Sequence, residues 1–134
     1  MAFTSTILCV DDDEDDLLFI REAIAAQPHP FEIAEAQNGF EAIEILRKAV
    51  ETEALPCLVI MDMNMPKMDG KQAVTRIREM PELAPVPIVL FTTSTNKDHR
   101  AWFEDQGVHF ISKPYDYGAF KSQIHDLLRL CAGL

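Results

Sequence analysis

The sequence predicts an α/β fold in which a doubly wound, five-stranded parallel sheet is flanked by five helices. Short apolar runs alternate along the chain with helix-length amphipathic segments, which is typical of repeated βαβ units. The 134 residues, of which 48% are hydrophobic, are enough for one domain with its own core. We therefore expect a single domain over residues 1–134, without an effector domain.

Five short apolar runs are the strand candidates. They lie at residues 7–10, 31–36, 58–61, 88–91 and 110–112. Helices are expected between and after them, at about 15–26, 39–50, 71–80 and 98–106, and in the segment that follows Pro114. Pro28, Pro56 and Pro81 follow the first three helices, where a proline prevents continuation.

Composition excludes several classes of function. The net charge of −10 argues against a nucleic-acid-binding surface, because neutralising phosphates needs clustered Lys and Arg. No segment approaches the roughly 20 apolar residues that span a bilayer, and no basic-then-apolar leader begins the chain. Cys9, Cys57 and Cys131 are odd in number and lie in apolar runs, which favours buried reduced thiols over disulfides. We expect a cytoplasmic protein.

Charged residues directly follow three of the predicted strands. Asp11 and Asp12 come after the first strand, Asp62 after the third and Lys113 after the fifth. In an open parallel sheet, ligands bind beyond the carboxyl ends of the strands, so these side chains can meet there. Paired carboxylates are suitable ligands for Mg²⁺, and a carboxylate beside a metal and a cation can attack phosphorus.

The acidic run and the hydroxyl residues leave two points open. Residues 11–16 are all acidic, and we interpret Asp13 to Asp16 as a solvated group that caps the first helix. Thr92 and Thr93 follow the fourth strand, and strand alternation directs only one of them towards the site. We favour Thr92 as the hydroxyl donor.

Four segments together resemble the receiver domain of the two-component response-regulator family. They are the run Ile7-Leu8-Cys9-Val10-Asp11-Asp12, the loop 62–70, the segment 87–92 and the run Phe110-Ile111-Ser112-Lys113-Pro114. The resemblance extends over residues 6–132 and implies the flavodoxin-like receiver fold. The acidic run, the Thr92-Thr93-Ser94 triplet and the expected lack of an effector resemble stand-alone regulators of bacterial phytochromes.

The resemblance also implies roles for single residues. Asp62 would be the phosphoacceptor, Asp12 a direct Mg²⁺ ligand and Asp11 a ligand through water, with the Asn64 carbonyl completing the protein's share. Thr92 and Lys113 would bind the phosphoryl group, and Thr92 would act with Phe110 as a conformational switch. Asn64 and Ser94 match the positions that influence dephosphorylation.

The implied function is signalling rather than turnover. A sensor histidine kinase, of the phytochrome type or another, or a histidine phosphotransfer protein would supply the phosphoryl group. Its transfer would reshape the face made by the fourth helix, fifth strand and fifth helix, through which a homodimer can also form and an unknown protein target can be reached. Two alternatives stay open: an adaptor that is never phosphorylated, and a small aspartyl-phosphate phosphatase. A role as an intermediate phosphorelay carrier is also open.

Overall fold

The computed structural model describes residues 2–63, 65, 67–92, 97–114 and 116–131, the side chains of 2, 3 and 97–99 excepted. Its main sheet has five parallel strands in the order β3-β2-β5-β6-β7. They are β2 (Thr6–Val10), β3 (Glu32–Ala36), β5 (Leu58–Asp62), β6 (Ile88–Thr92) and β7 (Val108–Ser112). The predicted doubly wound sheet is confirmed, although its last strand begins at Val108 rather than at residue 110.

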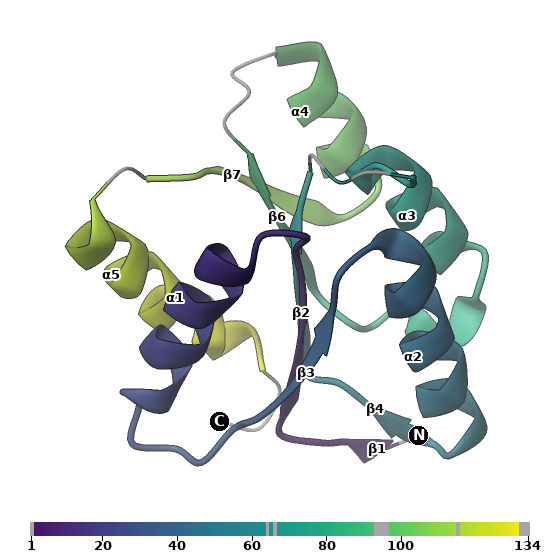
Figure 1. Cartoon of the computed structure of the whole chain (residues 1–134). Helices are drawn as coiled ribbons and strands as arrows, with labels where there is room; N and C mark the ends of the chain where they lie inside the picture. Colours follow the sequence, from purple (N-terminus) through teal and green to yellow (C-terminus); the bar gives the residue numbers. More distant parts are fainter. Residues whose placement is uncertain (1, 64, 66, 93–96, 115, 132–134) are drawn as a thin grey trace.

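The helices cover both faces of this sheet (Figure 1), with α1 and α5 on one side and α2 and α3 on the other. They are α1 (Glu14–Ala25), α2 (Gly39–Glu51), α3 (Gly70–Arg78), α4 (Lys97–Asp105) and α5 (Tyr117–Leu127), with 3₁₀ turns η1 (Pro81–Leu83) and η2 (Leu128–Leu130). Four of these helices begin after an Asp or Asn whose side chain accepts backbone N–H groups of the first turn. The caps are Asp13, Asn38, Asp69 and Asp116.

A second, two-stranded ribbon escaped the sequence analysis. It pairs β1 (Ala2–Phe3) in parallel with β4 (Ala54–Leu55), below the main sheet in Figure 1. Strands of two residues are too short to show any alternation of apolar and polar side chains, so a pattern in the sequence cannot reveal them.

The core consists of two apolar layers, one on each face of the sheet. Along β2, Ile7 and Cys9 belong to the layer under α1 and α5, whereas Leu8 and Val10 belong to the layer under α2 and α3. Phe103 of α4 contributes to this second layer. Strands buried on both faces explain why the strand candidates are continuous apolar runs.

The prediction of three reduced thiols is wrong for two of the cysteines. Cys57, just before β5, and Cys131, just after η2, form a disulfide with a Cα–Cα distance of 4.6 Å. Cys9 is free and buried. The two paired cysteines are 74 residues apart in sequence, and the packing of α5 against the sheet brings them together. The expectation of a cytoplasmic protein therefore loses the support that three unpaired thiols would have given it.

In the part of the chain that the structure describes, every helix is too short or too polar to cross a bilayer.

Candidate functional site

Three carboxylates meet at the carboxyl end of the sheet, as the parallel topology predicts. Asp62 is the last residue of β5, and Asp11 and Asp12 directly follow β2, the neighbouring strand. One carboxylate oxygen from each of the three lies within 4.8 Å of the other two. Asp11 is buried, Asp62 is half-buried and Asp12 is exposed. Closely spaced hard oxygen donors with open access fit a cation such as Mg²⁺.

Asp11 is the buried member of this group, and its charge is costly to bury. Its residue is 2% exposed, and its Oδ1 accepts the backbone N–H of Asp13 at 3.0 Å. Burial raises the pKa of Asp11 to about 7, and the charges of Asp62 and Asp16 act in the same direction, partly offset by the Asp13 N–H and by Lys113. Ionising the Asp11 carboxyl group is therefore costly unless a cation lies near it.

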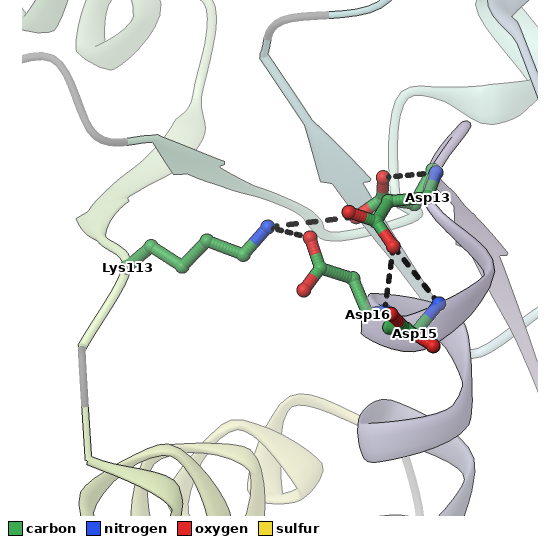
Figure 2. Close-up of polar contacts among 5 residues, drawn as sticks. Asp13, Asp15, Asp16 and Lys113 are labelled. Carbon is green, nitrogen blue, oxygen red and sulfur yellow. Dashed lines mark hydrogen bonds and ion pairs between the residues drawn. The ribbon is translucent and has the colours of Figure 1, made fainter.

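Lys113 provides a cation at the same edge of the sheet (Figure 2). It follows β7, and its backbone N–H donates to the carbonyl of Thr92 at 2.7 Å, which fixes its position beside β6. Its Nζ lies 3.6 Å from Oδ2 of Asp11 and forms an ion pair with Asp16. Burial lowers the pKa of Lys113, but the hydrogen bond to Asp16 and the charges of Asp11, Asp62 and Asp16 outweigh it, so the pKa is raised.

Thr92 and Phe110 lie towards the face of the sheet opposite to α1 and α5, on the side of α4. Both are buried, with exposures of 0% and 6%. The Phe110 ring stacks on that of Phe103 in α4 at a centroid distance of 5.2 Å, and the Arg100 guanidinium lies 5.5 Å from its centre. Phe110 therefore points inward and connects β7 to α4.

The segment after Asp62 is held back against the sheet by a backbone contact. The N–H of Gly70, at the start of α3, donates to the carbonyl of Met63 at 3.0 Å. A Cβ at position 70 would lie 3.1 Å from the Met63 Cα, tighter than most real contacts, so glycine allows this approach. The start of α3 is thus tied to Met63, the residue that directly follows Asp62.

Asp16 is the site residue that the sequence analysis missed. Asp13 does cap α1, as expected, but Asp16 pairs with Lys113 instead of lying free in solvent. A signal was present, since Asp16 precedes the buried Ile20 and Ile24 by four and eight residues, on the helical stripe that faces the sheet. Because Asp16 lies in a run of six acidic residues, the sequence favours interpreting it as part of a solvated group.

Three of the predicted residues lie outside the described part of the chain. They are Thr93, Asn64 and Ser94. The expectation that Asn64 completes the metal shell, and the roles of Asn64 and Ser94 in dephosphorylation, stay predictions. The preference for Thr92 over Thr93 likewise stays a prediction.

Comparison with known proteins gives a consistent result. The family model of the response regulator receiver domain matches residues 7–125. Over 94 residues the chain is 32% identical to Response regulator Rcp1 of Synechocystis sp., covering 69% of this chain and 64% of that protein. Over 125 residues it is 30% identical to a Vibrio cholerae protein named Probable cyclic di-GMP phosphodiesterase, covering 92% of this chain. The chain spans just under two thirds of the first relative and 26% of the second.

Solved structures share the same architecture. The crystal structure of the phosphorylated cyanobacterial phytochrome response regulator RcpA has a TM-score of 0.85 and 27% identity, and the match covers 96% of this chain and 94% of that one. The Mn²⁺-bound form of response regulator Rcp1 has a TM-score of 0.84 and 23% identity, with 96% of each chain covered. These likenesses confirm the predicted flavodoxin-like fold.

Proposed function

The chain belongs to the response regulator receiver domain family of two-component signalling, and from that premise we propose that Asp62 accepts a phosphoryl group from a phosphohistidine. A carboxylate oxygen of Asp62 attacks phosphorus in line, the bond from phosphorus to the imidazole nitrogen breaks, and an acyl phosphate forms. The position of Asp62 supports this role: it ends β5 beside Asp11 and Asp12, and the Lys113 ammonium acts on it electrostatically.

Mg²⁺ is the proposed cofactor, held by Asp11, Asp12 and Asp62. The fit rests on the donor set, because three carboxylate oxygens within 4.8 Å of one another leave open positions for water and phosphate. When bound, the ion supplies positive charge to the phosphoryl oxygens. The Mn²⁺-bound form of Rcp1 shows that a protein of the same fold binds a divalent ion.

Lys113 and Thr92 are the proposed phosphoryl-binding residues. Lys113 brings a compact positive charge to the edge where Asp62 lies, and its backbone is fixed by Thr92. Thr92 lies at the end of β6 and can supply a hydroxyl donor to a phosphoryl oxygen. Movement of Thr92 would be passed to Phe110, which is stacked on Phe103, and so to α4.

The proposed partner is a sensor histidine kinase, and a kinase of the phytochrome type is the first candidate. The likeness to Rcp1 and to RcpA supports that choice, because RcpA is described as a cyanobacterial phytochrome response regulator. A histidine phosphotransfer protein would present the same phosphohistidine chemistry. Phosphotransfer profiling against the kinases of the host identifies the donor.

The test is incubation of the purified protein with Mg²⁺ and acetyl phosphate, followed by intact mass measurement. We expect a mass increase of one phosphoryl group that depends on Mg²⁺ and is absent in Asp62→Asn. Asp69→Asn is the matched control, because Asp69 is exposed, lies on the same loop and caps α3 in a way that asparagine can replace.

Other outcomes identify the alternatives. If the mass of the wild-type protein does not increase, the protein is an adaptor that is not phosphorylated. Consumption of many donor molecules for each protein molecule would indicate the phosphatase.

A further inference from the structure

The ion pair between Lys113 and Asp16 joins the proposed phosphorylation site to α1. The two residues are 97 positions apart in sequence, and their side chains are only 19% and 25% exposed. Figure 2 shows Lys113 extended towards Asp16. The Oδ2 atom of Asp11 lies 3.6 Å from the same ammonium. The pair is therefore shielded in part from water, which strengthens it relative to a surface ion pair.

Both partners are fixed in place by backbone hydrogen bonds. The Asp13 side chain accepts the N–H groups of Asp15 and Asp16, which orders the first turn of α1. On the other side, the N–H of Lys113 donates to the carbonyl of Thr92. The pair thus follows from how α1 and β7 are anchored, and a flexible surface contact would lack these constraints.

The ammonium of Lys113 serves several acids at once. Its Nζ forms ion pairs with Asp16 and Asp11, and Asp62 also acts on its charge. Among the described residues, the group able to hold a metal ion comprises Asp11, Asp12 and Asp62 and leaves Asp16 out. Asp16 therefore contacts the cation that would bind the phosphoryl group without belonging to the metal ligands.

We infer that Asp16 is a positioning residue that competes with the phosphoryl group for Lys113. In the unphosphorylated protein its carboxylate holds the ammonium towards α1. When Asp62 carries a phosphoryl group, the anion and Asp16 share one cation, so the Asp16 contact weakens binding of the phosphoryl group. This inference rests on the proposed function of Asp62.

The test measures the affinity for beryllium fluoride, which mimics a phosphoryl group on a carboxylate, at saturating Mg²⁺. Asp16→Asn keeps the shape of the side chain and removes its charge, and should bind the mimic about fivefold more tightly, the upper range for a partly exposed ion pair. Asp16→Glu restores the charge and should return towards the wild-type affinity. Asp15→Asn removes an exposed charge from the same helical turn and should leave the affinity unchanged.

A double-mutant cycle separates competition from simple repulsion. If Asp16 acts through Lys113, Asp16→Asn should have no effect on affinity in a Lys113→Gln background. A fivefold gain that persists without Lys113 would show long-range repulsion and overturn the inference.

The outcomes also separate this inference from the function on which it rests. Equal affinities of wild type and Asp16→Asn would refute the role of Asp16 alone. Failure of the wild-type protein to bind the mimic at all would refute the proposed function, and the inference with it.

Discussion

Replacing Asp11 by asparagine should stabilise the protein when no divalent metal is bound. The structure buries this carboxylate at 2% exposure, beside Asp62 and Asp12. Asparagine has nearly the same shape and can still accept the N–H of Asp13 through its carbonyl oxygen. It has no negative charge to bury, so the repulsion within the acidic group falls.

The size of the effect follows from the pKa of Asp11. Folding raises this pKa from 3.8 to about 7, a difference worth about 4 kcal/mol as an upper value. The folded protein then holds the proton more tightly than the unfolded chain, so the free energy of unfolding falls as pH rises from about 4 to about 7. The variant lacks this loss, and its advantage should be small below about pH 4 and complete above about pH 8.

Urea unfolding in the presence of a chelator measures this difference, with the fluorescence of Trp102 as the signal. Asp12→Asn is the matched control, because it removes the same charge from an exposed carboxylate and should gain little. Adding Mg²⁺ should stabilise the wild type more than Asp11→Asn, because stabilisation by a ligand of the folded state increases with its affinity. Equal gains for the two variants, or a gain independent of pH, would refute the reasoning.

Two further predictions concern the core. In denaturant without reductant only Cys9 should react with a thiol reagent, and reducing the Cys57–Cys131 bond should lower the free energy of unfolding by about 4 kcal/mol, the value for a loop closed over 74 residues; three reactive thiols before reduction would contradict this. Phe103→Ala should destabilise the protein by about 3 to 5 kcal/mol in urea unfolding, since Phe103 is 1% exposed, whereas Phe40→Ala, at a 48% exposed position, should cost far less.

The position of the site could be predicted because it depends on strand ends. Asp11, Asp62 and Lys113 each follow an apolar run, and parallel strands place all such residues at one edge of a sheet. The order of the strands is not needed for that inference. The structure then adds what spacing cannot give, namely that the three acids lie within 4.8 Å of one another.

Two contacts could not be predicted because they depend on how helices pack. Asp16 meets Lys113 only because α1 packs on the sheet with its first turn near the end of β7. Cys57 meets Cys131 only because α5 runs back along the same face of the sheet. Sequence patterns define which side of a helix is buried but not the neighbour it meets. Contacts between distant elements therefore required the structure.

The charges at the site explain why its proposed chemistry needs two kinds of cation. Asp11, Asp16 and Asp62 all act on the ammonium of Lys113, and Asp12 belongs to the same acidic group as Asp11 and Asp62. A phosphoryl group on Asp62 replaces one negative charge by nearly two, which Lys113 alone cannot balance while Asp16 holds it. A divalent ion on the acidic group offsets the excess, and release of Lys113 from Asp16 supplies the rest. Metal binding should therefore stabilise the phosphorylated state, whereas the Asp16 contact should destabilise it.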